Sequence, residues 1–364
     1  MSNRVATNKK PSTQINISAV DLFCGAGGLT RGLEKSGIKV NLGIDIDAAC
    51  EYPYSVNNNA QFLLKSVDDV RASELLDAYG STGLKLLAGC APCQTFSTYN
   101  QKASTSDKRW WLLLQFSRLI KETKPELVTM ENVPGLLDQD VFKAFVSDLV
   151  EQGYSVDFQV VRCAEYGLPQ QRTRLVLLAS QLGPIVLLSP KGFKRKRKNV
   201  EDVLKKLPEL KAGAVDAKDS LHQSALLSEI NHQRIVVSKP GGTWRDWPEE
   251  LVADCHKKKS GKTYPSVYGR MKWDEPAPTI TTQFYGFGNG RFGHPEQNRA
   301  ISIREGAILQ SFPKGYKFIP PGQPVNKTAL GRMIGNAVPV LLGEVIGKSI
   351  LKHVTEYTTT VCEA

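Results

Sequence analysis

The sequence predicts an α/β protein with a largely parallel sheet and a second, irregular domain. Between residues 17 and 180, short runs rich in Val, Ile and Leu alternate with helical patterns, as in sheets whose strands are connected through helices. From about residue 181 this periodicity weakens, and Gly, Pro, Trp and Lys gather in loop-like clusters. The first pattern indicates the sheet, and the change of pattern indicates the second domain.

Five apolar runs are expected to be strands, and two helices stand out. The strands are NISAVDLF, IKVNLGID, KLLAGC, ELVTM and RLVLLAS. Residues 139–152 predict a helix, because their apolar residues recur at helical spacing and form one stripe. That stripe consists of Val141, Phe142, Phe145, Val146, Leu149 and Val150. A further helix is expected over 339–354, with Pro339 in its first turn.

Composition bounds the class of protein. With 364 residues, 41% apolar and 23% charged, the chain is globular and long enough for about two domains. No apolar stretch approaches the length of a membrane span, so no membrane association is expected. The N-terminus has no apolar core typical of a secretory signal, and residues 1–16 are expected to form a flexible tail. Seven scattered cysteines indicate a reducing, intracellular compartment.

The charge balance is basic. Lys and Arg number 47 against 36 Asp and Glu, a formal net charge of +11. This favours a polyanionic partner, nucleic acid first, over a merely soluble basic protein. The run KGFKRKRKN at 191–199 holds six basic residues in nine.

The first strand ends in a glycine-rich turn, DLFCGAGGLTRG. Gly25, Gly27 and Gly28 would let backbone approach a ligand, but the sixth position counted from Gly25 is Thr30, so the dinucleotide fingerprint fails. Asp45 follows the second strand about 20 residues later, where an acid typically binds ribose hydroxyls. Together they suggest a nucleoside-bearing cofactor without a pyrophosphate. The alternative is an ordinary turn, with Asp45 or Asp47 as a helix N-cap.

Cys90 and Cys93 form a C-x-x-C pair after the next strand. A zinc site usually needs a second ligand pair, which is missing, and a redox pair normally opens a helix, so neither a metal site nor a redox pair is expected. A cysteine on a loop at a strand's carboxyl end is better placed as a nucleophile. The polar loop 94–109 that follows could close over a substrate.

An acid and two arginines complete the candidate set. Glu131 stands at the end of ELVTM, either as a general acid or as a capping carboxylate. Arg172 and Arg174 would share one face of a strand. They could hold a phosphate, orient Glu131 or lie exposed on a sheet edge.

Taken in order, DLFCGAGG, PCQTFS, MENVPG and PQQRTR resemble motifs of the DNA cytosine-5-methyltransferases of bacterial restriction-modification type, and APTITT, REGAILQSFP and IGNAVPV resemble its C-terminal motifs. The resemblance spans about residues 17–355. It implies a methyltransferase sheet with helices on both faces, in a bacterial cytoplasmic protein. It also implies methyl transfer from S-adenosylmethionine to carbon 5 of a flipped-out cytosine in a specific double-stranded DNA sequence.

The resemblance implies residue roles by position. Cys93 matches the nucleophile that forms a covalent adduct, Glu131 the carboxyl at cytosine N3, and Arg174 the arginine beside it, with Arg172 in the same motif. The positions matching the cofactor site are Phe23, Gly25, Gly27, Asp45, Ile46, Ser66, Val67, Asn336 and Val338. The adenine contact has two possible registers, Ser66-Val67 or Asp69-Val70, because the family's usual Asp-Ile is absent.

The resemblance also divides the chain. Residues 17–180 and 325–364 would form the catalytic, cofactor-binding domain, and 181–324 the target-recognition domain. We expect a monomer that acts on double-stranded DNA, with a cognate restriction endonuclease as a further partner. The alternatives are a tRNA cytosine-5 methyltransferase and a catalytically silent DNA-binding relative. A Rossmann oxidoreductase is disfavoured because the glycine-rich turn does not match the dinucleotide-binding fingerprint.

Overall fold

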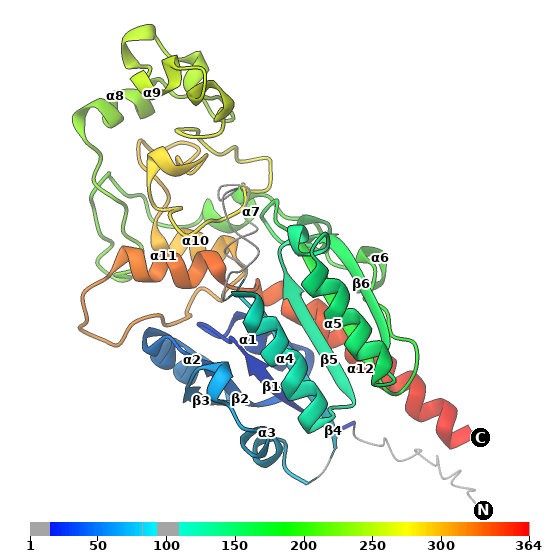
Figure 1. The fold of residues 1–364 in the computed structure, drawn as a ribbon. Coiled ribbons are helices and arrows are strands. Elements are labelled where there is room, and N and C mark those ends of the chain that lie inside the picture. The colour runs from blue at the N-terminus through cyan, green and yellow to red at the C-terminus, as the bar shows by residue number, and fades with distance from the viewer. Residues whose placement is uncertain (1–14, 82, 93–108, 364) are drawn as a thin grey trace, which may run out of the picture.

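The computed structural model describes residues 15–81, 83–92 and 109–363, without the side chains of 109, 110, 262 and 361–363. Cys93, most of the expected tail and nearly all of loop 94–109 therefore lie outside the described residues. In the described part, a seven-stranded sheet lies between two layers of helices, and an irregular region extends from one end of it (Figure 1). The predicted α/β class is confirmed.

The strand order is β3-β2-β1-β4-β5-β7-β6. Neighbours from β3 to β5 run parallel, whereas β7 is antiparallel to both β5 and β6. The strands are β1 (Ile17–Leu22), β2 (Lys39–Asp45), β3 (Gln61–Leu64), β4 (Leu84–Gly89), β5 (Leu127–Asn132), β6 (Ser155–Arg162) and β7 (Thr173–Ser180).

Two strands have no counterpart among the five expected from the sequence. β3 has only four residues, none of them buried, and β6 lies at the sheet edge with much of its length exposed. Neither strand carries the continuous apolar run of a central parallel strand. The five expected runs, in contrast, coincide with β1, β2, β4, β5 and β7.

Helices cover both faces of the sheet. Leu29 and Leu33 of α1 pack with α12 on one face, while α3, α4 and α5 cover the other (Figure 1). The helices are α1 (Gly28–Ser36), α2 (Glu51–Asn57), α3 (Ala72–Tyr79), α4 (Arg109–Thr123), α5 (Asp140–Glu151), α6 (Pro190–Phe193), α7 (Val200–Leu204), α8 (Glu229–Val237), α9 (Asp254–Lys257), α10 (Ile303–Leu309), α11 (Lys327–Asn336) and α12 (Val340–Glu363).

Both helices that the sequence singled out are present. In α5, Phe142, Phe145 and Leu149 are buried as expected, but Val150 is 56% exposed and lies outside the buried stripe. α12 starts directly after Pro339 and continues well beyond residue 354. The stretch Lys327–Thr360 is long and apolar enough to cross a membrane by length and composition, yet 78% of its apolar window is buried inside the protein. Packing against α1 and the sheet accounts for its hydropathy.

The region after β7 contributes short helices and isolated β-bridges, and none of its described residues joins the seven-stranded sheet. One apolar cluster joins it to the sheet region, since Ala26 packs in the same core as Phe284 and Phe312. A second cluster further out centres on Trp244 and Trp247. The irregular region therefore has one core of its own and is anchored beside the glycine-rich turn through the shared cluster.

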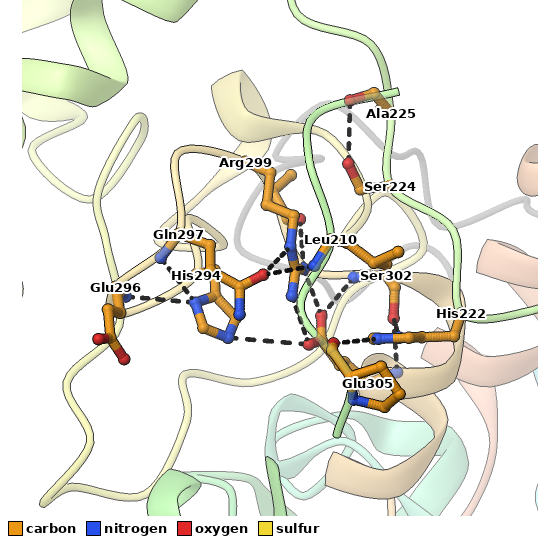
Figure 2. Close-up of polar contacts among 12 residues, drawn as sticks. Leu210, His222, Ser224, Ala225, His294, Glu296, Gln297, Arg299, Ser302 and Glu305 are labelled. Atoms are coloured by element: carbon orange, nitrogen blue, oxygen red, sulfur yellow. Dashed lines mark hydrogen bonds and ion pairs between the residues drawn. The ribbon is translucent and has the colours of Figure 1, made fainter. Parts of the chain in front are cut away.

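A buried polar cluster fixes the inner part of this region (Figure 2). Arg299 makes a two-pronged contact with Glu305, at 2.7 and 2.8 Å. His294 accepts backbone N–H bonds from Glu296 and Gln297 at Nδ1, so its proton resides on Nε2, 3.8 Å from Glu305. Burial lowers the pKa of His294 to about 4. Burial alone would raise the pKa of Glu305, but the contacts with Arg299 lower it to about 2.

Candidate active site

Since β2 and β4 lie on opposite sides of β1, the order of connection reverses there, and ligands of such sheets bind at the carboxyl ends of the strands next to that point. The glycine-rich turn after β1 occupies this place. Phe23, Gly25 and Gly27 all have positive φ, of 58°, 52° and 87°. For an aromatic residue this conformation is strained, and such strain is concentrated at functional sites.

The turn is closed on one side and open on the other. A Cβ on Gly27 would lie 2.4 Å from Asn58 Nδ2, and a Cβ on Gly28 would lie 2.2 Å from the carbonyl oxygen of Val338. A Cβ on Gly25 would meet nothing within 4 Å. The backbone can therefore be approached by a ligand at Gly25, while Gly27 and Gly28 are required by close packing.

Asp45 ties the end of β2 to this turn. Its Oδ2 accepts the N–H of Gly25 at 2.8 Å, and its Oδ1 accepts the N–H of Asp47 at 2.9 Å. Burial raises the pKa of Asp45 above its ordinary range, an effect that these N–H bonds oppose. The N-cap is Asp47, which accepts the N–H of Ala49. Beside Asp45, the residue Ile46 is 73% exposed.

Ser66 follows β3 closely, while Asp69 lies three residues further on. The N–H of Lys65 donates to the carbonyl oxygen of Asp45 at 3.0 Å, which holds Ser66 near the end of β2. Ser66 caps a short 3₁₀ helix, and Val67 is buried in the core. This geometry favours the Ser66-Val67 register of the two that the sequence allowed.

The last two positions of the predicted cofactor set lie at the end of α11, with Asn336 as its final residue and Val338 in the turn after it. Val338 is buried with its carbonyl against Gly28, while Asn336 is exposed. The structure thus brings the turn, Asp45, the end of β3 and the 336–338 loop together at one edge of the sheet. An open backbone at Gly25, a carboxylate and exposed apolar surface at Ile46 fit a nucleoside-bearing group.

Glu131 lies further along the same edge, at the end of β5, and is 2% exposed. Its Oε1 is 2.9 Å from Nε of Arg174, and its Oε2 accepts the Sγ–H of Cys90 at 2.9 Å. Next to it, Asn132 donates from Nδ2 to the carbonyl oxygen of Ala91 at 3.0 Å. The carboxylate is therefore held from both sides, and the chain leading toward residue 93 is fixed to β5.

Arg172 has different partners from Arg174. It precedes β7, is 2% exposed and donates to the carbonyl oxygens of Ile280, Gly335 and Ala337 at 3.1–3.3 Å. Burial lowers its pKa to about 9. Of the alternatives left open by the sequence, Arg174 pairs with Glu131, whereas Arg172 joins the start of β7 to two later segments.

Sequence reasoning missed two features of this edge. The sequence assigns Cys90 no role, yet its thiol donates to Glu131. Asp21, under the glycine-rich turn, is buried and accepts a hydrogen bond from Thr30 Oγ1 at 2.6 Å, and burial raises its pKa to about 7. An acid inside an otherwise apolar strand was the available signal for Asp21. No sequence signal pairs Cys90 with Glu131, because 41 residues separate them.

The chain matches the family model for C-5 cytosine-specific DNA methylase over residues 17–352. It is 52% identical over 336 residues to the Type II methylase M.HgiDII of Herpetosiphon aurantiacus, covering 92% of this chain and 94% of the relative. It is 33% identical over 348 residues to the Type II methyltransferase M.Eco47II of Escherichia coli, covering 92% and 78%.

Solved structures agree in fold. A DNA modification methyltransferase encoded within an Escherichia coli prophage aligns with a TM-score of 0.72 at 22% identity, covering 93% of this chain and all of that one. The S. pombe Dnmt2 methyltransferase aligns with a TM-score of 0.57 at 17% identity, covering 93% and 99%. At these identities the likeness shows the fold alone. From the family match and the two relatives, the chain belongs to the C-5 cytosine-specific DNA methylase family and is a DNA (cytosine-5)-methyltransferase.

Proposed function

We propose that this methyltransferase uses S-adenosylmethionine and methylates a cytosine within a specific duplex DNA sequence, through a covalent bond to Cys93. The observation that carries the proposal is the pairing of Glu131 with Arg174 and Cys90 at the end of β5. It supports a carboxyl group fixed beside the chain that leads to Cys93. The experiment that tests it is bisulfite sequencing of DNA from cells that express the chain, which reports both activity and target.

The proposed cofactor site is the edge around the glycine-rich turn. When bound, S-adenosylmethionine would supply an electrophilic methyl group. Asp45 would accept hydrogen bonds from the ribose hydroxyls while keeping its bond to Gly25. Phe23 and Ile46 would contact the adenine through apolar surface, with Ser66 and Val67 beside them. Gly25, Gly27, Asn336 and Val338 would form the backbone of the pocket.

The proposed chemistry begins at cytosine carbon 6. Carbon 5 is a weak nucleophile, and addition of the Cys93 thiolate to carbon 6 turns the ring into an enamine that can accept a methyl group at carbon 5. Glu131 shares a proton with N3, which relieves the negative charge that develops there. A base then removes the hydrogen on carbon 5, and the returning electron pair expels the Cys93 thiolate.

Arg174 and Arg172 have distinct proposed roles. Arg174 orients Glu131 toward the substrate. Arg172 is a positioning residue, because its guanidinium is bound to main-chain oxygens. The target carbon is inaccessible in a stacked duplex, so the base must be flipped out to reach both groups.

In the proposed domain organisation, residues 181–324 recognise the target sequence, and residues 17–180 and 325–364 form the catalytic domain. The separate apolar cluster around Trp244 and Trp247 supports a recognition unit with a core of its own. The enzyme would act as a monomer in the bacterial cytoplasm, with a cognate restriction endonuclease as its partner system. The Type II names of the relatives support the restriction-modification system. Comparing methyl transfer to duplex DNA and to tRNA excludes or reveals an RNA substrate.

A further inference from the structure

A cleft of about 580 Å³ lies at the seam between the sheet and the irregular region, next to the proposed cytosine site. Its walls are the end of β6 with the turn after it, the start of β7, residues 197–199 and residues 274–276. Because β7 is antiparallel to both β5 and β6, β6 ends at the same edge of the sheet as Glu131. Arg162 pairs with Thr173, one residue from Arg174. The cleft is thus one strand away from the Glu131–Arg174 pair.

Backbone hydrogen bonds between these walls form the cleft in advance. The N–H of Gln171 donates to the carbonyl oxygen of Ala277 at 2.7 Å, and the N–H of Ala277 donates to that of Pro169 at 2.9 Å. The N–H of Val200 donates to the carbonyl oxygen of Glu275 at 3.0 Å. Such main-chain contacts hold the two regions in register, and ligand sites are usually formed in advance in this way.

Three arginines line the cleft, and Arg172 is bound to main-chain oxygens. Arg162 and Arg197 are both exposed, and in the described part of the chain no ion pair or hydrogen bond of either guanidinium is found. In contrast, Arg195 in the same basic run pairs with Glu344 at 3.3 Å. The basic run therefore divides, with Arg195 tied to α12 and Arg197 directed to the cleft. Two unpaired guanidiniums in the lining of one cleft are suited to one phosphate.

The cleft also contains the carboxylates of Glu165 and Asp274 and the amide of Asn199. Carboxylates would repel a bare anion, but they accept hydrogen bonds from exocyclic amino groups such as N4 of cytosine. A lining that combines guanidiniums, carboxylates and an amide therefore suits a nucleotide better than a free phosphate ion. Its volume is within the range of pockets that hold small organic ligands.

Resting on the proposed function, we propose that the seam cleft binds one nucleotide unit of the DNA strand that flanks the target cytosine. The phosphodiester lies between Arg162 and Arg197, and a base with an amino group faces Asp274. The cleft would thus hold the strand next to the flipped base and read one flanking position.

The test compares the wild type with Arg162→Met, Arg197→Met and the double variant. Lys196→Met is the matched control, because it removes the same charge one residue away and its side chain is not part of the cleft. DNA affinity is measured against salt concentration. One shared phosphate predicts that the double variant lowers the slope of log K against log salt by about 0.9. It also predicts that the losses of DNA-binding free energy in the two single variants sum to more than the loss in the double variant. Lys196→Met should leave the slope unchanged.

A second arm uses Asp274→Asn and duplexes that differ at one flanking base. The wild type should prefer an amino-bearing base there by several-fold, and the variant should lose that preference. Saturating DNA should restore kcat in every variant to within about twofold, since none of these residues belongs to the proposed chemistry. If the wild type transfers no methyl group to DNA, the proposed function is wrong. If it does transfer methyl groups but the variants do not behave as predicted, only the cleft proposal is wrong.

Three results would overturn the cleft proposal. The first is an unchanged salt slope in the double variant. The second is an equal loss in Lys196→Met, which would indicate a diffuse basic surface. The third is binding of free deoxycytidine monophosphate that the double variant abolishes while the DNA slope stays constant, which would make the cleft a site for free nucleotides.

Discussion

Glu131 and Arg174 face each other across neighbouring strands, with Oε1 of the carboxylate 2.9 Å from Nε of the guanidinium. Because β5 and β7 are antiparallel, residues 43 positions apart in the sequence meet at one edge of the sheet. The other carboxylate oxygen accepts a hydrogen bond from the thiol of Cys90. The proposed proton-sharing group is therefore fixed in orientation before DNA binds.

The first prediction concerns this fixed carboxylate. Replacing Arg174 by Met should lower kcat by about 10- to 100-fold, because it leaves the buried Glu131 carboxylate without its ion-pair partner. Steady-state kinetics measures the effect, and the KM for the methyl donor should change little. A large rise in that KM with an unchanged kcat would assign Arg174 to cofactor binding instead.

The second prediction separates the two cysteines of the C-x-x-C pair. Cys93→Ser should abolish turnover, because an alkoxide is far less available at neutral pH than a thiolate. Cys90→Ser should be mild, since a hydroxyl can still donate to Glu131, whereas Cys90→Ala should cost roughly fivefold in kcat. Equal loss of activity in Cys93→Ser and Cys90→Ser would return the pair to a metal or redox role.

The third prediction concerns the cofactor. Asp45→Ala should weaken binding of S-adenosylmethionine by roughly 1–3 kcal/mol, since it removes a charged acceptor and frees the N–H of Gly25. Phe23→Ala should weaken it as well by removing aromatic surface. Asp47→Ala is the control, because that side chain caps a short helix and pairs with Arg332. Calorimetry that finds wild-type affinity in Asp45→Ala and Phe23→Ala would place the cofactor elsewhere.

The fourth prediction concerns pH and the cluster in Figure 2. The pKa of His294 falls from 6.5 to about 4 on folding, mainly through burial. Between these values the unfolded chain binds a proton that the folded protein does not, so the free energy of unfolding should fall as pH drops from 6.5 to 4. The loss from this group should approach about 2–3 kcal/mol near pH 4.

His294→Asn provides the comparison for this prediction, because its Oδ1 can still accept the N–H bonds that Nδ1 accepts. Denaturant unfolding at pH 7, 6, 5 and 4 should give a flatter pH dependence for the variant. Glu305 should not obscure the result, since its pKa of about 2 causes loss of stability only as pH falls from about 4.5 toward 2. Parallel curves for the two proteins would show that His294 is not held neutral.

How far the sequence could predict this structure depended on the length and burial of each element. β1 and β5 are buried along their whole length, so their apolar runs were recognisable. β3 and β6 were not, because a short strand and a sheet-edge strand need little apolar surface. Asp45 and Glu131 could be singled out from the sequence because each stands at the end of an expected strand, where ligand sites of such sheets occur.

Contacts between distant segments could not be predicted in the same way. The spacing of Arg172 and Arg174 suggested one shared face, yet β7 begins at Thr173 and only Arg174 meets Glu131. The carbonyl oxygens that bind Arg172 lie more than 100 residues later in the sequence. Likewise, nothing in the run 191–199 distinguishes Arg195 from Arg197 until Glu344 is seen to pair with one of them.

The covalent route through Cys93 is tested most directly with duplex DNA that carries 5-fluorocytosine at the target position. After methyl transfer, carbon 5 then bears fluorine in place of the hydrogen that a base must remove, so the cysteine cannot be expelled. We predict a protein–DNA adduct that survives denaturing electrophoresis, requires S-adenosylmethionine and Cys93, and forms slowly with Glu131→Gln. An enzyme that methylates ordinary sites but forms no adduct on the fluorinated site would contradict this account.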